Sequence, residues 1–485
     1  MFKQNQLFIF YHWLINLRVS ILPPLLPEIA KGKIMWKSLR KKVRKLSPAQ
    51  VIVSYYLFAV TASTLLLSLP IALRDGVKIT FLDALFTAVS AVSVTGLSTI
   101  NISETYTVTG YFILMFVFQI GGIGVMTLGT FFWVLVGKKI GLRDRRLIMT
   151  DQNQSNLSGL VKLTKQIWSI IIVIEVVGAL ILGFYFLHYY PTWEEAFLHG
   201  LFTSVSATTN AGFDITGASL IPFAHDYFVQ IVIIILITLG AIGFPVLIET
   251  KEYLKGKHKP AKFRFSLNTK ITTVTFSCLL IFGTVIIYIF ELPGFFRNME
   301  WHEALFYSIF QSATTRSSGL ATMDVGNFSE PTLLVLSILM FIGASPSSVG
   351  GGIRTTTLAL NLLFLYHFAK GNQTIKVFKR EIHQQDIIKS FVVTLMASII
   401  CFIAVVLLSL TEGQTLVAII FEVGSAFGTT GLSMGITSEL TAIGKLVIII
   451  LMFIGRVGIL LFLFMIGGNE KRANYHYPKE KIIIG

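Results

Sequence analysis

Residues 87–99 read TAVSAVSVTGLST, a run of small and hydroxyl-bearing residues between two long apolar stretches. Gly96 closes the run, and no ionisable residue lies in it. Similar spellings recur three times, as TSVSATTNAGFD from Thr203, QSATTRSSGLAT from Gln311 and EVGSAFGTTGLS from Glu422. The four glycines, at about 110-residue intervals, are Gly96, Gly212, Gly319 and Gly431. This repetition predicts four equivalent structural units in one chain.

Composition indicates that these units lie in a membrane. The 485 residues are 54% hydrophobic and 13% charged, whereas soluble domains carry about 25% charged residues. Eight stretches are long and apolar enough to span a bilayer, which takes roughly 20 residues. They run at about 49–70, 110–136, 166–190, 227–248, 270–291, 331–366, 391–410 and 441–467. The sequence therefore predicts an all-α polytopic membrane protein.

The net charge of +15 comes mainly from alternate loops. Basic residues cluster at 37–45, 138–146, 251–270, 370–389 and 471–481. Loops rich in Lys and Arg face the cytoplasm, so we expect both termini there and all four turns on the outer side of the cell membrane. Attraction to anionic membrane lipids adds to this reading, and no nucleic-acid partner is expected.

Each expected unit has the order helix, pore helix, filter turn, helix. The short helices near 81–92, 194–207, 301–313 and 416–427 cannot cross a bilayer, which suits re-entrant segments around one central pore. The expected boundaries are a cytoplasmic extension at 1–45, repeats at 46–140, 141–252, 253–370 and 371–470, and a tail at 471–485. The filter turns lie at 93–97, 209–213, 315–320 and 429–432.

Irregular backbone at membrane depth must be buried in protein or line water. Four such turns on one axis would aim carbonyl oxygens at a cation and replace its water shell. A single turn would more simply be a glycine helix cap, but four matched turns favour a filter. The expected ion-binding residues are Ser93, Val94, Thr95, Gly96, Thr209, Asn210, Ala211, Gly212, Ser317, Ser318, Gly319, Thr429, Thr430 and Gly431.

With GASPSSVGGGIRTTT from Gly343, FIGRVG from Phe453 and the final YPKEKIIIG, these turns resemble the Trk/Ktr/HKT superfamily of potassium transporters. The likeness is strongest to its Ktr-type (KtrB-like) membrane subunit and covers about residues 46–485. It implies a bacterial K⁺ uptake protein, in which glycine at the first turn favours K⁺. Na⁺ activation or co-permeation stays open. It also implies a homodimer on a cytosolic, nucleotide-binding RCK ring of the KtrA kind.

The sixth apolar stretch is interrupted at 343–353. Pro346 and three consecutive glycines disfavour a helix there, and a polar loop at this depth is tolerated where it lines a pore. A plain glycine kink is the simpler alternative, and a phosphate loop lacks its GK[ST] ending. The resemblance implies a gating loop. The expected gate residues are Gly343, Ala344, Ser345, Pro346, Ser347, Ser348, Gly350, Gly351, Gly352 and Arg456.

Three charges fall inside apolar segments. Arg456 should face the cavity and repel cations, with loop carbonyls or the hydroxyls of Ser345 and Ser347 as candidate partners. Arg316 should brace the third turn from behind, against an acid such as Glu422. Glu175 is either a proton or ion site or, more simply, part of a helix–helix hydrogen bond.

No catalytic motif is present, so we expect no enzyme activity. A lipid-linked membrane enzyme would need acidic or histidine clusters at a membrane boundary, whereas the outer acids Glu194, Glu195, Glu300 and Glu303 start pore helices. The alternative function is a Na⁺/K⁺- or H⁺/K⁺-coupled secondary carrier. Such carriers use inverted repeats, whereas all four units here have one orientation.

Overall fold

The computed structural model of this chain describes residues 47–124, 149, 160–256, 263–372, 374–467, 478 and 480. The chain divides into two compact units, residues 1–51 and 52–485. Apart from residues 47–51, the features below belong to the second unit. The expected extension at 1–45 lies outside the described residues. So does the expected tail at 471–485, apart from Pro478 and Glu480.

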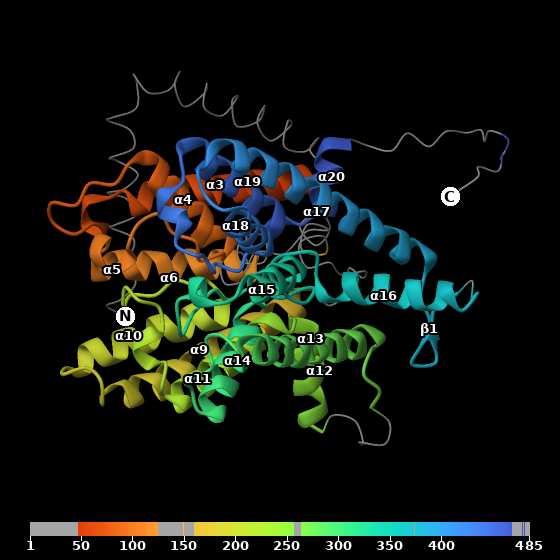
Figure 1. Ribbon diagram of the computed structural model, residues 1–485, viewed down its shortest axis with the longest axis horizontal. Coiled ribbons are helices and arrows are strands. Elements are labelled where there is room, and N and C mark those ends of the chain that lie inside the picture. Colours follow the sequence, from red (N-terminus) through yellow and green to blue (C-terminus); the bar gives the residue numbers. More distant parts are fainter. Residues whose placement is uncertain are drawn as a thin grey trace, which may run out of the picture. The chain divides into compact units, whose positions relative to one another are not determined.

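The described elements are helices and one short hairpin, and they follow a similar order four times (Figure 1). The first group is α3 (Pro48–Leu67), η1 (Pro70–Ala72), α4 (Phe81–Ser93), α5 (Ile102–Thr105) and α6 (Val108–Ile123). The second is α9 (Leu160–Phe186), α10 (Trp193–Thr209), η2 (Ile221–Phe223), α11 (Tyr227–Ala241) and α12 (Phe244–Leu254).

The third group is α13 (Leu267–Glu291), α14 (Trp301–Thr314), η4 (Val325–Asn327), α15 (Glu330–Ile342) and α16 (Thr355–Ala369). An antiparallel hairpin of β1 (Lys376–Val377) and β2 (Arg380–Glu381) leads to the fourth. That group is α17 (Gln384–Thr411), α18 (Leu416–Gly428), η5 (Ile436–Glu439), α19 (Ala442–Val457) and α20 (Ile459–Gly467).

The short helices α4, α10, α14 and α18 are linked in a ring by neighbouring helices. Helix α6 packs on α4 and α10, and α11 packs on α10 and α14. Helix α13 packs on both α14 and α15, α15 packs on α18, and α19 packs on both α18 and α4, which closes the ring. Each short helix buries one phenylalanine completely; these are Phe86, Phe202, Phe310 and Phe421.

The short helices are capped where they begin. The side chains of Thr80, Thr192 and Thr415 accept hydrogen bonds from backbone N–H groups in the first turns of α4, α10 and α18. Glu194 and Glu195 lie in the first turn of α10, as the sequence predicts. Glu300 and Glu303 likewise begin α14. Negative charge there complements the positive end of each helix dipole.

Two predicted spans are bent rather than straight. Among the described residues, α3, α9, α13 and α17 are long and apolar enough to cross a membrane. The expected spans at 227–248 and 441–467 are instead pairs, α11–α12 bent by 104° and α19–α20 bent by 102°. Gly243 and Gly458 hold φ angles of 102° and 90° at the bends, outside the helical region. The expected span at 110–136 continues beyond Gly124, outside the described residues.

Asp83 ties the first group to the fourth. Its Oδ1 lies 2.8 Å from Lys445 Nζ and accepts a 2.8 Å hydrogen bond from Thr99 Oγ1. Its Oδ2 accepts a 2.6 Å bond from Thr80 Oγ1 at the start of α4. Burial raises the pKa of Asp83, but these hydrogen bonds outweigh it and hold the pKa below the usual aspartate range.

Replacing Asp83 with asparagine should lower the thermal unfolding midpoint at pH 7. A hydrogen bond to a charged group contributes about 1.5–3 kcal/mol to stability. The bond between Lys445 and Asp83 joins the fourth group of helices to the first. Because the folded pKa is lowered, the stabilisation is complete above the unfolded value of about 3.9 and disappears as pH falls through the folded pKa. Differential scanning fluorimetry in detergent should therefore show a constant gap from wild type between about pH 5 and 8. A gap that widened on acidification would contradict this assignment.

Candidate functional site

The four glycines of the repeated turns meet in a closed ring. All have positive φ angles, of 96°, 71°, 74° and 95° for Gly96, Gly212, Gly319 and Gly431 respectively. A Cβ placed on Gly96 would lie 2.8 Å from the carbonyl oxygen of Ala211, and one on Gly212 would lie 2.6 Å from that of Ser318. A Cβ on Gly319 would collide with the carbonyl oxygen of Thr430.

The fourth turn closes the cycle, because a Cβ on Gly431 would collide with the carbonyl oxygen of Thr95. Each glycine thus faces the carbonyl that precedes the glycine of the next turn. Backbones this close leave no room for a side chain, which is why glycine is required. Carbonyl oxygens arranged around one axis can replace the water shell of a bare cation.

Hydrogen bonds within each turn hold this backbone in place. Thr95 N–H donates to Ser90 O at 2.8 Å, and Ala211 and Thr430 make the same bond five residues back, at 2.7 and 2.8 Å. Two positions before the glycine, Val94, Asn210, Ser317 and Thr429 all have positive φ angles. Such angles cost non-glycine residues about 1–2 kcal/mol each, so the surrounding packing must enforce them.

Not every predicted filter residue offers a free side chain to the ring. Ser93 Oγ bonds to Val89 O at 2.6 Å and lies 2.7 Å from Thr95 Oγ1. Thr209 Oγ1 donates back to Val205 O at 2.7 Å. These hydroxyls are bonded at the helix ends, whereas Ser318 Oγ and Thr430 Oγ1 have no hydrogen-bond partner among the described residues. Backbone carbonyls, together with such free hydroxyls, are the groups suited to a cation.

The third turn is one residue shorter than the others. Phe310 precedes Gly319 by nine positions, whereas Phe86 precedes Gly96 by ten, and the second and fourth turns also have ten. Consequently Ser318 N–H bonds to Thr314 O four residues back, at 2.9 Å, instead of five. The Phe-to-Gly spacing could have revealed this difference from sequence.

Arg316 lies in this shorter turn and is completely buried. Its Nη2 donates to Leu339 O of α15 at 3.1 Å, so it does brace the turn from behind. The expected pairing with Glu422 is wrong within the described residues. There, Glu422 accepts from Thr437 Oγ1 at 2.5 Å, and no ion pair involves Arg316.

The predicted loop separates α15 from α16 and packs against the second group of helices. Ser345 N–H donates to Ala241 O at 3.0 Å, and Val349 N–H donates to Gly240 O at 3.3 Å. In return, Phe244 N–H donates to Ser347 O at 2.8 Å. The loop is thereby fixed to the bend between α11 and α12.

The other predicted loop residues shape it internally. Gly343 and Gly352 have φ angles of 70° and 83°, and a Cβ on Gly343 would collide with Gly351 O. Ala344 N–H donates to that same carbonyl at 3.2 Å, and Ser348 Oγ donates to Ser345 O at 2.6 Å. A Cβ on Gly243 would lie 2.8 Å from Pro346 O, so the loop fits closely against the bend.

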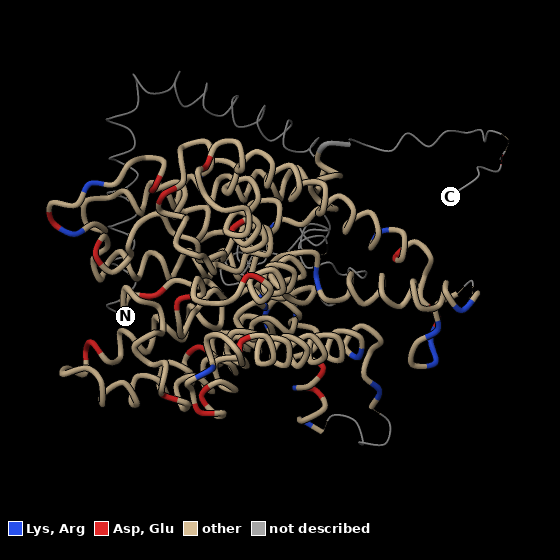
Figure 2. Tube along the Cα trace, in the orientation of Figure 1, with Lys and Arg blue, Asp and Glu red and all other residues tan. Residues whose placement is uncertain are grey.

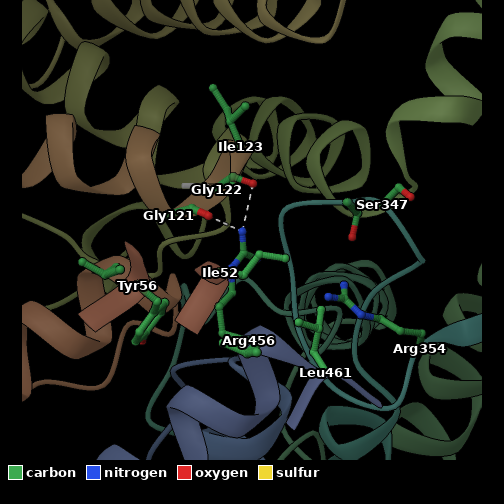
Figure 3. Close-up of a pocket in the computed structure, with 13 residues that line it drawn as sticks. Ile52, Tyr56, Gly121, Gly122, Ile123, Ser347, Arg354, Arg456 and Leu461 are labelled. Carbon is green, nitrogen blue, oxygen red and sulfur yellow. Dashed lines mark hydrogen bonds between the residues drawn. The ribbon is translucent and has the colours of Figure 1, made fainter. Parts of the chain in front are cut away.

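Arg456 joins three groups beneath the ring. Its Nη1 donates to Val349 O of the loop, and its Nη2 donates to the carbonyls of Gly121 and Gly122 at the end of α6 (Figure 3). These partners are backbone carbonyls, one of the possibilities expected from the sequence. Ser345 O instead accepts a hydrogen bond from Arg354 Nη1 at 3.3 Å. The guanidinium lines a pocket with Tyr56 and Ser347.

Arg354 is a second cation at this pocket, which the sequence analysis missed. Its φ angle is 81°, and its Nη1 also donates to Gly350 O. Its signal in the sequence was an arginine following three glycines within an apolar segment, comparable to Arg456. Two guanidinium groups in one pocket would oppose the passage of cations.

Glu175 forms a helix–helix hydrogen bond, one of its two expected roles. Its Oε1 accepts a 2.5 Å hydrogen bond from Gln119 Nε2, which links α9 to α6. The backbone carbonyl of Glu175 accepts from Ser204 Oγ at 2.8 Å. Neither contact reaches the ring. Among the described residues, no group of three or more acidic, histidine or cysteine side chains could hold a metal ion.

A repeated G-x-x-G pattern occurs at the ends of α6, α11 and α19, where these helices pass close to the turns of the ring. The sequence analysis overlooked this pattern. It occurs at 121–124, 240–243 and 455–458. A Cβ on Gly121, Gly240 or Gly455 would collide with the carbonyl of Val92, Thr208 or Phe427 respectively. Each of these carbonyls precedes a ring glycine by four residues. The final glycines, Gly124, Gly243 and Gly458, take φ angles of 95°, 102° and 90°.

Known proteins resemble this chain in sequence and in fold. Residues 29–466 match the TrkH family, described as cation transport proteins. The chain is 58% identical over 445 residues to Ktr system potassium uptake protein D of Bacillus subtilis, covering 92% of this chain and 99% of that protein. It is 36% identical to the potassium/sodium uptake protein NtpJ of Enterococcus hirae, with the same coverage. The crystal structure of TrkH from Vibrio parahaemolyticus matches with a TM-score of 0.69 at 18% identity, over 87% of this chain and 85% of that one.

Proposed function

This chain belongs to the TrkH family of cation transport proteins, and on that premise we propose that it takes up potassium ions through the ring of four turns. The closed ring of Gly96, Gly212, Gly319 and Gly431 carries this proposal, because it brings four backbone turns around one axis. The name of the 58% identical relative, a potassium uptake protein, supports K⁺ as the cation.

The filter we propose consists of residues 93–97, 209–213, 315–320 and 429–432, one turn in each repeat. Ions would lose water there and be driven inward by the membrane potential, worth about 2.3 kcal/mol per charge per 100 mV. The repeats we propose are 46–140, 141–252, 253–370 and 371–470. Each contributes one turn to the ring.

The gate we propose is the loop at 343–353 together with Arg456. The loop is bonded to the α11–α12 bend, and Arg456 links it to α6. Opening would break these bonds and withdraw positive charge from the path. The described contacts support a closed gate.

Orientation follows from charge. Figure 2 shows most described lysines and arginines near α12, α16 and the β1–β2 hairpin, and most acids towards the opposite end. Since basic loops face the cytoplasm, we propose that the ring is nearer the outside of the cell membrane and both termini lie inside. Anionic lipids would contact the basic end.

We also propose the partners that a Ktr-type system implies. The name of the Bacillus subtilis relative refers to a Ktr system, which supports a separate subunit. We propose a homodimer of this chain on a cytosolic, nucleotide-binding RCK ring. Size-exclusion chromatography with light scattering, with and without that ring, tests the assembly.

A second candidate function involves Na⁺. The relative NtpJ is named a potassium/sodium uptake protein. Na⁺ stimulation or coupling of uptake therefore remains the alternative to simple K⁺ conduction. A carrier should show uptake that requires a Na⁺ or H⁺ gradient, whereas a conducting pore needs only the membrane potential.

Rubidium uptake into proteoliposomes tests the proposal. We expect uptake driven by a K⁺ gradient, blocked by external K⁺ and little affected by Na⁺. Gly96→Ser should weaken this discrimination by about tenfold, since about 1.4 kcal/mol of lost K⁺ preference suffices. Wild-type vesicles without cation flux, even with the cytosolic ring supplied, would refute it.

A further inference from the structure

The Ser317 hydroxyl lies between the loop and the fourth turn of the ring. It accepts a 3.2 Å hydrogen bond from Gly351 N–H of the loop. It donates to Thr429 O of the fourth turn at 2.6 Å. A hydroxyl has one proton to give, so accepting from Gly351 helps to direct that proton towards Thr429. One side chain thus connects gate and ring.

The equivalent residues of the other turns lack this link. Val94 is apolar, and the Asn210 side-chain amide has no hydrogen-bond partner among the described residues. Thr429, whose carbonyl accepts the bond from Ser317, has its own Oγ1 3.1 Å from Ser317 Oγ. Of these four positions, Ser317 is where the described loop backbone donates to a turn side chain.

The loop packs on Ser317 without a gap. A Cβ on Gly350 would lie 2.6 Å from both Cβ and Oγ of Ser317. A Cβ on Gly351 would lie 2.5 Å from Thr429 Oγ1. Two glycines of the loop are therefore required by contact with the ring, and the loop cannot move without changing this contact.

The residue before Ser317 holds the other end of the same segment. Arg316 Nη2 donates to Leu339 O, and Gly343 N–H donates to that oxygen at 3.2 Å. Gly343 is where α15 ends and the loop begins. Of these consecutive residues of the shortened third turn, Ser317 thus bonds to the loop near its end, and Arg316 bonds to the end of α15, at the carbonyl that also accepts from the first loop residue.

We propose that Ser317 is a positioning residue that couples the gate to the filter. With the loop in place, Ser317 engages the Thr429 carbonyl and reduces the charge that this oxygen offers an ion. When the loop leaves, Ser317 loses its donor from Gly351 and can rotate, which frees that carbonyl. Gate opening and ion preference at this turn are then linked. This inference rests on the proposed function.

A double-mutant cycle tests the link, because residues that act through one contact have non-additive effects. Arg456→Gln loosens the loop, and Ser317→Ala removes the hydroxyl. The measured quantity is the ratio of Rb⁺ to Na⁺ flux in proteoliposomes. We expect Arg456→Gln to change this ratio by about fivefold in wild type, the effect of one buried hydrogen bond. In the Ser317→Ala background the change should be less than about twofold, although total flux still rises.

Two further variants separate positioning from folding. Ser317→Gly also removes the hydroxyl and suits the φ angle of 87°, so it should fold and behave like Ser317→Ala. Ser337→Ala is the matched control, because among the described residues that buried hydroxyl makes its hydrogen bond within α15, to Leu333 O at 2.8 Å. In its background Arg456→Gln should keep its full effect on the ratio.

An equal change in the ratio with and without the Ser317 hydroxyl would overturn the coupling. So would a ratio that Arg456→Gln leaves unchanged in the otherwise wild-type protein. Both results presuppose K⁺-selective flux in wild type and so leave the proposed function intact. Absence of any wild-type flux would instead defeat the proposed function, and this inference with it.

Discussion

Gly319→Ala is expected to reduce potassium-selective uptake by about tenfold or more. The new methyl group would collide with Thr430 O and lie 2.9 Å from the Cα of Gly431, so the third and fourth turns must separate. If this displacement of the coordinating oxygens weakens ion binding by about 1.4 kcal/mol, the affinity for the ion falls tenfold. The φ angle of 74° adds about 1–2 kcal/mol of backbone strain.

A matched control distinguishes crowding from strain. Gly435 also has a positive φ angle, of 90°, but nothing lies within 4 Å of a Cβ placed there. Gly435→Ala should therefore lower the unfolding midpoint slightly and leave the Rb⁺-to-Na⁺ flux ratio as in wild type. If both variants lost selectivity equally, close approach of the turns would not be the cause.

Arg456→Gln is expected to raise the rate of rubidium uptake by about tenfold or more. Arg456 holds the loop through Val349 and α6 through Gly121 and Gly122. A hydrogen bond from a charged donor contributes about 1.5–3 kcal/mol, and its loss would favour the open gate by at least that factor of ten. Removing the charge also lowers the barrier to a cation. Flux into proteoliposomes at a fixed membrane potential measures both effects.

Arg297→Gln provides the control for Arg456→Gln. Arg297 is exposed in the segment between α13 and α14, and among the described residues no hydrogen bond or ion pair joins its side chain to the loop. Its replacement by glutamine removes the same charge. Its uptake rate should match wild type. A folded Arg456→Gln protein with unchanged or slower uptake would show that this arginine does not hold the gate closed.

The repeated turns could be predicted because local sequence determines them. Four glycines after four short apolar helices indicate a repeat, and a segment with Pro346 and three glycines cannot stay helical. The structure places these turns and this loop together. Their roles as filter and gate stay predictions.

Other features depend on tertiary contacts that sequence patterns do not encode. Arg456 binds carbonyls of residues 107 and 335 positions away, and every residue has a carbonyl, so no pattern marks these partners. The bends at Gly243 and Gly458 lie in predominantly apolar stretches, where hydrophobic periodicity gives no signal. There the G-x-x-G spacing, rather than periodicity, was the informative feature.

The most direct test locates the ion itself. Crystals of the protein grown with rubidium would give an anomalous signal at each bound ion. A peak on the axis of the ring, beside the carbonyls of Thr95, Ala211, Ser318 and Thr430, is the predicted result. A peak elsewhere, such as at Glu175, with none at the ring under saturating rubidium, would contradict the account.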